Sequence, residues 1–134
     1  MTSRTFPADR AAPRAATEWL RSLPLGLSEA RAWDAELCLD ELVTNVVLHA
    51  WPDGPGHEVT VRVEQTASDL EITVENDGPR FDPSKVRVAP PTLSLDDTVP
   101  GGRGLMLVRS IAPRLRYERR DGRNLVTVAF PLEG

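Results

Sequence analysis

Cysteine, long apolar runs and an excess of basic charge are all scarce or missing in this sequence. Its single cysteine, Cys38, cannot form an intrachain disulfide, so no disulfide framework supports secretion. The first ten residues contain no apolar core like that of a signal peptide, and no apolar run is long enough to span a bilayer. The formal net charge of -4 gives no general attraction to nucleic-acid phosphates. We therefore expect a cytoplasmic protein that binds neither membrane nor nucleic acid directly.

The remaining composition is that of a globular domain. The chain has 134 residues, of which 40% are hydrophobic and 27% charged, although aromatic residues make up only 5%. This length is enough for one hydrophobic core but too short for two independent ones. The sequence thus predicts a single domain over residues 1–134.

Two segments near the start have the periodicity of amphipathic helices. The first extends from Ala8 to Leu23. The second begins at Ser28, a suitable N-cap, and continues to about Ala50, before a Pro- and Gly-rich stretch. Its apolar residues recur at three- and four-residue steps and predict one face that packs on a sheet: Leu39, Leu42, Val43, Val46, Val47 and Ala50. The same periodicity predicts that Asp34, Glu41 and Asn45 lie on the opposite face.

Four segments alternate polar and apolar residues as half-buried strands do. Their spacing predicts two hairpins, residues 58–65 with 69–75 and residues 115–119 with 125–130, the second joined by a turn at Asp121-Gly122. Together with the helices they predict an α+β fold, a two-layer α/β sandwich. Its sheet is expected to be mixed but mainly antiparallel, with the helices covering one face.

A proline-rich stretch separates the two hairpins. Residues 79–100 show no sustained periodicity, and a long loop of this kind in a compact domain is usually either a functional lid or disordered. Residues 104–112, GLMLVRSIA, then read as a short helix.

Glu41 and Asn45 are the first candidates for chemistry. Side chains four residues apart on a helix are neighbours, so these two can converge on one ligand. A carboxylate can accept a proton, and a carboxamide oxygen is a suitable ligand for Mg²⁺. Taken alone, the pair is more typical of a solvated helix face.

Two further segments contain turn or anion-binding residues. Asp77 and Gly78 follow a predicted strand, where they are typical of a turn but also suit contact with the amino group of adenine. The segment Gly101-Gly102-Arg103-Gly104 leads directly into the last predicted helix, where exposed backbone amides attract phosphate. A flexible glycine hinge explains that segment equally well.

The order of these elements resembles a known architecture, the Bergerat-type ATP-binding fold shared by gyrase, heat-shock chaperones, histidine kinases and mismatch-repair ATPases. In particular, the chain resembles the anti-sigma-factor serine-protein kinases. Their N box reads E-x-x-T-N-x-x-x-H, and residues 41–49, ELVTNVVLH, match it at every fixed position. The resemblance extends over nearly the whole chain.

This resemblance implies a role for each candidate residue. Glu41 is implied to be the general base for a serine or threonine hydroxyl, and Asn45 to bind the magnesium ion that bridges the ATP phosphates. Asp77 and Gly78 are implied to contact adenine. The phosphate-binding residues are implied to be Gly101, Gly102, Arg103, Gly104 and Leu105, with an ATP lid at about residues 79–103.

Two positions depart from the family pattern. Arg80 stands where the broader fold often has a second glycine of Asp-x-Gly-x-Gly. A threonine that helps to hold adenine often follows the last glycine turn, whereas this chain has Arg123-Asn124-Leu125-Val126. Thr127 is out of register with that threonine, and we leave it out of the site.

The implied function is that of an ATP- and Mg²⁺-dependent serine/threonine kinase. It would act as an anti-sigma factor and phosphorylate a STAS-type anti-anti-sigma protein, in which case its partners are that antagonist, a sigma factor and, in a homodimer, a second copy. The alternative is a non-catalytic ATP-binding regulator that sequesters a sigma factor or another partner. The catalytic domain of a two-component histidine kinase fits less well, because no helix with a phosphoacceptor histidine precedes the ATP domain.

Overall fold

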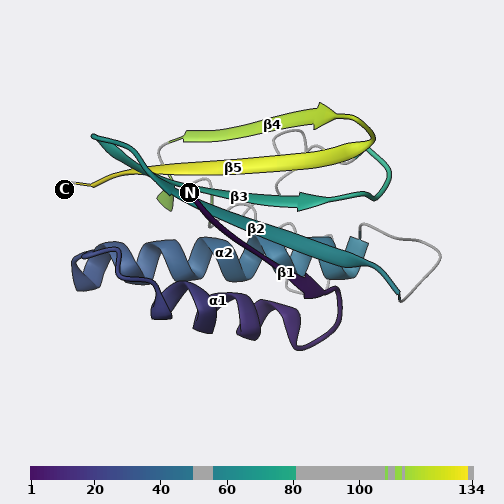
Figure 1. Cartoon of the computed structure of the whole chain (residues 1–134), viewed down its shortest axis with the longest axis horizontal. Coiled ribbons are helices and arrows are strands. Elements are labelled where there is room, and N and C mark those ends of the chain that lie inside the picture. The colour runs from purple at the N-terminus through teal and green to yellow at the C-terminus, as the bar shows by residue number, and fades with distance from the viewer. Residues whose placement is uncertain (50–55, 81–107, 109–110, 113, 133–134) are drawn as a thin grey trace, which may run out of the picture.

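The computed structural model describes residues 1–49, 56–80, 108, 111, 112 and 114–132. These residues form two layers, an antiparallel sheet and a pair of helices that cover one of its faces (Figure 1). In chain order the elements are β1 (Thr2–Pro7), α1 (Ala12–Ser22), α2 (Glu29–His49), β2 (Glu58–Gln65), β3 (Asp69–Asn76), β4 (Arg114–Arg120) and β5 (Arg123–Pro131). The predicted two-layer α+β fold is confirmed.

The sheet has the strand order β1-β2-β3-β5-β4. Every pairing between these strands is antiparallel, so the described sheet is not mixed as the sequence suggested. Both predicted hairpins form, and the second turns at Asp121 and Gly122, both of which have positive φ (52° and 76°), as a tight two-residue hairpin turn requires.

β1 was not predicted. It is an edge strand whose buried side chain, Phe6, lies opposite Val59 of β2.

The helices begin and end where local hydrogen bonds permit. Ser28 caps α2 as predicted, because its Oγ accepts a hydrogen bond from the Arg31 amide at 3.2 Å. α1 starts at Ala12, later than the predicted Ala8. The Ala8 amide instead donates to the His57 carbonyl at 2.9 Å, which holds the chain against the start of β2.

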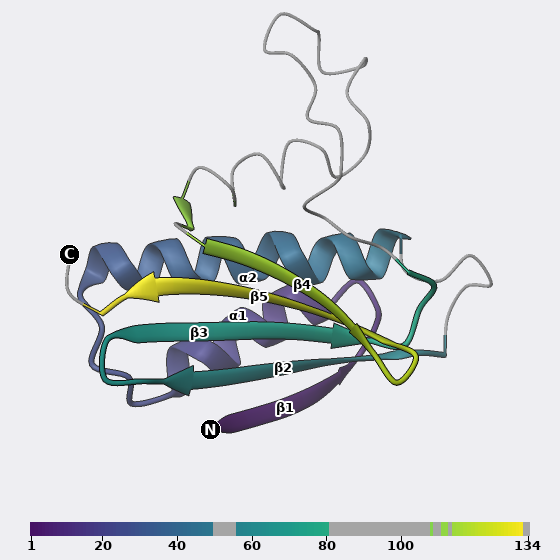
Figure 2. The same cartoon turned by 90° about the horizontal axis from the view of Figure 1, so that it is seen from above.

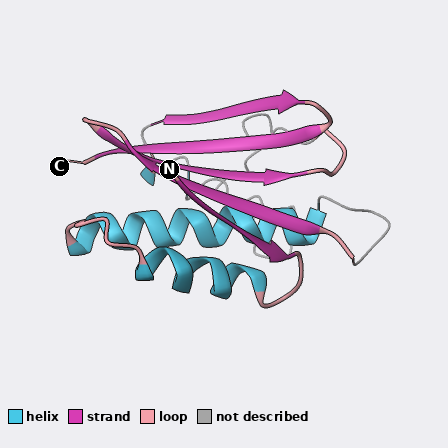
Figure 3. Cartoon of the chain, in the orientation of Figure 1, coloured by secondary structure: helices cyan, strands magenta, loops and turns pink. Residues whose placement is uncertain are grey.

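The core lies between the sheet and the helices. α2 packs against β3 and β5, while α1 packs against α2 and β1, and both helices lie on the same face of the sheet (Figures 2 and 3). The predicted apolar face of α2 is buried at Leu39, Leu42, Val43 and Val46. Full burial of each such side chain contributes about 1.5–3 kcal/mol.

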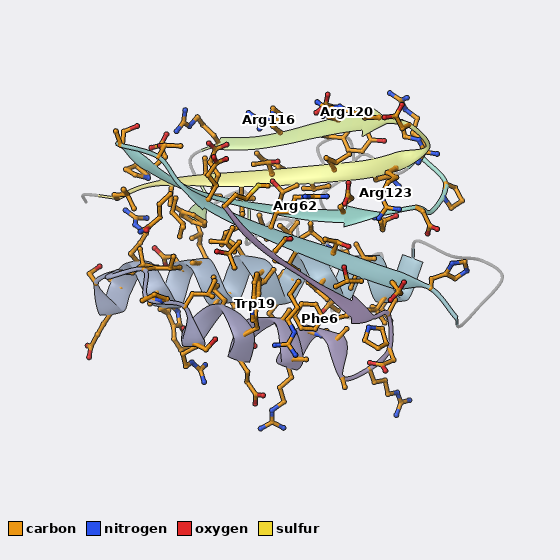
Figure 4. All side chains as sticks on the ribbon, in the orientation of Figure 1. Phe6, Trp19, Arg62, Arg116, Arg120 and Arg123 are labelled. Carbon is orange, nitrogen blue, oxygen red and sulfur yellow. The ribbon has the colours of Figure 1, made fainter. Side chains whose placement is uncertain are left out.

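The outer helix is anchored by an aromatic pair. Trp19 of α1 packs edge-on against Phe6 of β1, with the ring centroids 6.0 Å apart (Figure 4). Cys38 is completely buried in the core, as its helical position suggested. Within the described part of the chain, no helix has both the length and the apolarity needed to cross a bilayer.

Candidate functional site

The candidate residues on α2 and β3 lie at one end of the molecule. α2 and β3 run in the same direction, so their C-terminal ends lie at the same end in both views (Figures 1 and 2). Asn45 is one helical turn before the end of α2, and Asp77 directly follows β3. The fold thus brings two segments that are far apart in sequence to the same edge of the two layers.

Glu41 lies one helical turn before Asn45 and is half-buried. Burial raises the pKa of the Glu41 carboxyl above its ordinary value, and the neighbouring charge of Asp40 raises it further. Burial likewise raises the pKa of Asp40. A carboxylate with a raised pKa is a better proton acceptor than an ordinary glutamate.

Asn45 is buried, unlike the solvated helix face of which the Glu41 and Asn45 pair alone is typical. Its side chain is only 4% exposed. Glu41, by contrast, keeps part of its surface in solvent, as expected.

The Asn45 carboxamide has unused hydrogen-bonding capacity. Its Nδ2 is buried and has no hydrogen-bond partner among the described residues. A buried polar group without a hydrogen-bond partner lowers the stability of the fold by about 1–3 kcal/mol unless a ligand or another group bonds to it. Rotation of the amide presents either Nδ2 to a phosphate oxygen or Oδ1 to a cation, so the residue fits a magnesium-nucleotide.

Asp77 and Gly78 form a turn whose backbone is fixed by side chains. The Gly78 amide donates to Asn76 Oδ1 at 2.9 Å, which makes an Asx turn around Asp77. Gly78 is buried, whereas the Asp77 side chain is about half exposed, with Oδ1 3.8 Å from His57 Nδ1. The carboxylate that is predicted to receive adenine therefore projects from a well-ordered turn.

A polar cluster beside this turn was not predicted. Asn124 of β5, which is 1% exposed, donates from Nδ2 to the carbonyls of Pro79 at 2.8 Å and Gly78 at 3.3 Å. Its Oδ1 accepts hydrogen bonds from Tyr117 Oη at 2.7 Å and Arg119 Nη1 at 3.0 Å. The sequence signal was Asn124 itself, because it is a polar residue at one of the alternate positions of the strand that are otherwise apolar.

Arg80, which replaces the second glycine of the family pattern, lies next to the same cluster. Its guanidinium carbon lies 5.7 Å from the centroid of the Tyr117 ring, a cation–π contact. Thr127, which we left out of the site, makes a hydrogen bond of 2.8 Å between its Oγ1 and that of Thr73. Because side chains alternate along β5, Thr127 lies on the opposite face of the sheet from Asn124.

The predicted phosphate-binding residues Gly101, Gly102, Arg103, Gly104 and Leu105 lie outside the described residues, as does most of the predicted lid. The final part of the helix predicted over 104–112 is described. Val108 and Ile111 are helical, and the Ala112 amide donates to the Val108 carbonyl at 2.8 Å.

The Cys38 thiol is not a candidate nucleophile. Burial, with the nearby charges of Asp34 and Glu41, raises its pKa to about 12. It is therefore protonated at neutral pH and unreactive, in agreement with its predicted place in the core.

The sequence matches an established family model over nearly its whole length. The model describes a histidine kinase-like ATPase domain and covers residues 6–130. The chain belongs to the histidine kinase-like ATPase domain family.

Two curated relatives of this ATPase domain are named as protein kinases. The chain is 37% identical over 92 residues to the serine/threonine-protein kinase BtrW of Bordetella bronchiseptica, covering 69% of this chain and 65% of that one. It is 30% identical over 101 residues to the serine-protein kinase RsbW of Bacillus subtilis, covering 72% and 61%. The chain thus spans less than two thirds of the length of these relatives.

Solved structures confirm the fold of this ATPase domain. A structure of the RsbU and RsbW domains of a Mycobacterium tuberculosis protein matches 98% of this chain and 33% of that one, with a TM-score of 0.63 and 16% identity. A histidine kinase domain from Erythrobacter litoralis matches 75% of this chain and 44% of that one, with a TM-score of 0.51 and 25% identity.

Proposed function

We propose that this ATPase domain is an ATP- and Mg²⁺-dependent serine/threonine protein kinase that acts as an anti-sigma factor in the cytoplasm. Its phosphoacceptor would be a STAS-type anti-anti-sigma protein. The observation that carries the proposal is the pair on α2, a half-buried Glu41 of raised pKa one turn from the buried amide of Asn45. The names of the two curated kinases support it.

The nucleotide site that we propose is assembled within one domain, residues 1–134. Asp77 and Gly78 receive the adenine, and Asn45 holds the metal ion at the phosphates. The phosphates are wrapped by Gly101, Gly102, Arg103, Gly104 and Leu105, and a lid at about residues 79–103 closes over them. Hard cations such as Mg²⁺ bind amide oxygens, phosphates and water, so one carboxamide is a sufficient protein ligand.

The different roles that we propose for Glu41 and Asn45 follow from the chemistry of phosphoryl transfer. When bound, ATP would supply the transferable phosphoryl group, and the magnesium ion would neutralise the negative charge on that group. Glu41 positions the serine or threonine hydroxyl of the partner and accepts its proton on the carboxylate. Because the pKa of Glu41 is raised, this base is lost by protonation at a higher pH than for an ordinary glutamate.

Glu41→Ala tests the proposal most directly. Transfer of the phosphate from radiolabelled ATP to a STAS-domain partner should fall by about 10²–10⁴-fold, the usual contribution of a general base, while ATP binding in titration calorimetry is largely kept. Glu36→Ala is the matched control, because Glu36 is on the same helix but pairs with Arg21 of α1. Unchanged transfer in Glu41→Ala would refute the assignment.

The ligands of the nucleotide need a separate test. Asn45→Ala and Asp77→Ala should each abolish or strongly weaken magnesium-dependent ATP binding, because one removes the metal ligand and the other the partner of adenine. Titration calorimetry with and without Mg²⁺ distinguishes the two, since only the Asn45 variant should lose the dependence on the metal ion. Wild-type affinity in both variants would place the nucleotide elsewhere.

The alternative is a nucleotide-binding regulator that sequesters a sigma factor without transferring phosphate. It is favoured by Arg80, which replaces a glycine of the family pattern and is held against Tyr117 at the adenine end of the proposed site. A chain that binds ATP and a sigma factor but transfers no phosphate to any STAS partner would establish it. Equilibrium sedimentation would show whether the working form is a homodimer.

A further inference from the structure

A hollow of about 280 Å³ lies on the surface where α1 and α2 meet. The two helices lie side by side on one face of the sheet, so the hollow belongs to the helical layer (Figures 1 and 3). Its walls come from both helices: Thr17, Arg21, Trp33, Glu36, Leu37 and Asp40. Small-molecule pockets usually enclose about 300–1,000 Å³, so a smaller, open hollow is better suited to a few side chains of another protein.

Trp33 and Leu37 give this hollow an apolar wall. Trp33 is the largest apolar side chain that the described part of the chain leaves exposed, at 68%. Leu37 lies four residues further along α2, on the same face of the helix, and is half-buried. Trp19 of α1, by contrast, is used inside the fold, where it packs against Phe6. A single exposed apolar residue is ordinary, but a tryptophan beside an apolar hollow is typical of an interface anchor.

The two carboxylates of the hollow differ in how their charge is balanced. Glu36 Oε1 accepts a hydrogen bond from Arg21 Nε at 3.0 Å, which pairs the two charges across the helices. Asp40 has no cationic partner within the described ranges, and burial raises its pKa. A positive charge that enters the hollow therefore meets the uncompensated carboxylate of Asp40. The hollow is thus apolar at Trp33 and Leu37 and acidic at Asp40.

The hollow is next to Glu41, the base of the proposed transfer. Leu37 and Glu41 are four residues apart on α2, which places their Cβ atoms about 5–6 Å from each other on the helix surface. A serine hydroxyl alone offers too little area to hold a protein, because stable protein interfaces bury roughly 1,200–2,000 Å². The protein that brings its hydroxyl to Glu41 must therefore cover the surface around it, and this hollow offers it an apolar anchor.

We propose that the hollow is the docking site of the phosphoacceptor protein, which places an apolar side chain against Trp33 and Leu37 and a neighbouring lysine or arginine against Asp40. The inference rests on the proposed function, because it assumes that Glu41 receives the hydroxyl of that protein. Docking buries the exposed ring of Trp33 and gives Asp40 the cation that it lacks. Since the hollow is lined by residues other than the proposed ligands of the nucleotide, it sets the affinity for the protein substrate and not that for ATP.

Replacement of Trp33 tests the apolar part of the site. Transfer from radiolabelled Mg-ATP is measured on the full chain against increasing concentrations of the STAS-domain protein that accepts phosphate from the wild type. Trp33→Ser should raise KM for that protein about tenfold, the effect of losing one interface anchor, with kcat and the dissociation constant of ATP unchanged. Trp33→Phe keeps an aromatic ring and should stay within about two- to threefold of the wild-type KM. Because Trp33 is largely exposed, both variants should keep the wild-type melting temperature.

Asp40→Asn tests the acidic part, and Glu64→Gln is its matched control. Both changes remove one negative charge with almost no change of shape, but Glu64 follows the core residue Val63 on β2, so its side chain points to the face of the sheet without helices. Asp40→Asn should raise KM about threefold without lowering kcat, and its KM should depend less on salt concentration than that of the wild type. Glu64→Gln should change neither. An equal rise of KM in Glu64→Gln would show that net charge attracts the partner and would overturn the inference.

The remaining outcomes separate this inference from the proposed function. Transfer by the wild type with the same KM in Trp33→Ser would overturn the inference alone. So would equilibrium sedimentation that shows a wild-type homodimer and a Trp33→Ser monomer, because the hollow would then hold a second copy of the chain. A wild-type chain that transfers no phosphate to any STAS-domain protein would overturn the proposed function and the inference with it. A raised KM in Trp33→Ser, with kcat, ATP affinity and sedimentation unchanged, would support both.

Discussion

The carboxylates of β3 and two neighbouring carboxylates of α2, Asp40 and Glu41, are placed in opposite ways. On the open face each carboxylate of β3 has an arginine partner, Asp69 with Arg114, Glu71 with Arg116, and Glu75 with both Arg62 and Arg123. On α2, Asp40 and Glu41 have no cationic partner within the described residues, and burial raises the pKa of both.

This difference separates charges that stabilise the fold from charges that cost stability. A paired carboxylate at a strand position adds a favourable cross-strand interaction. A half-buried carboxylate without a partner loses hydration, and no ion pair compensates for that loss. Perturbed carboxyl groups of this second kind are concentrated at functional sites. The comparison therefore supports the catalytic role that we propose for Glu41 by a criterion that uses no motif.

The largest effect on stability is expected at Glu75, the most buried of the paired carboxylates. Its Oε2 lies 3.0 Å from Arg62 Nη2 and its Oε1 lies 3.4 Å from Arg123 Nε. Glu75→Gln keeps the shape but removes the charge that both arginines share, which should lower the free energy of unfolding by about 1–2 kcal/mol. Urea denaturation measures the change, and added salt should reduce it.

A smaller loss is expected at the exposed pair between Arg114 and Asp69. The Arg114 side chain is 63% exposed, so solvent already screens its charge. Arg114→Ala should cost no more than about 0.5 kcal/mol by the same urea measurement. If this variant were destabilised as much as Glu75→Gln, burial would not be what separates the strong pair from the weak one.

Much of the fold was predictable because its signals are local. The alternation in residues 58–65 gave β2 with the observed bounds, and Ser28 marked the start of α2. β1 was not predicted because only one of its six side chains, Phe6, is buried, so its sequence shows no alternation of polar and apolar residues. Its place at the sheet edge depends on pairing with β2, which no local pattern contains.

The site was predictable only where one segment carries its own signal. Glu41 and Asn45 are on one helix and Asp77 is in a turn sequence, so motif and spacing alone make them candidates. Asn124 meets the turn only through the β3–β5 register, across 48 residues from Asn76, and this pairing cannot be deduced from spacing.

The smallest expected effect has the opposite sign and concerns Glu41. Its folded-state pKa is raised above 4.5, so the neutral carboxyl stabilises the fold fully below that pH, and this contribution is lost as the pH rises through the folded pKa. Glu41→Gln cannot ionise, so its melting temperature should match that of the wild type at pH 4 and exceed it slightly at pH 7. The same variant should lose phosphate transfer, which would show that the carboxylate is kept for chemistry at a cost in stability. Asp40→Asn, whose carboxyl also has a raised pKa, should share the gain in stability but retain transfer. A lower melting temperature for Glu41→Gln at pH 7 would mean that a cation outside the described residues pairs with Glu41, and the contrast with the sheet face would fail.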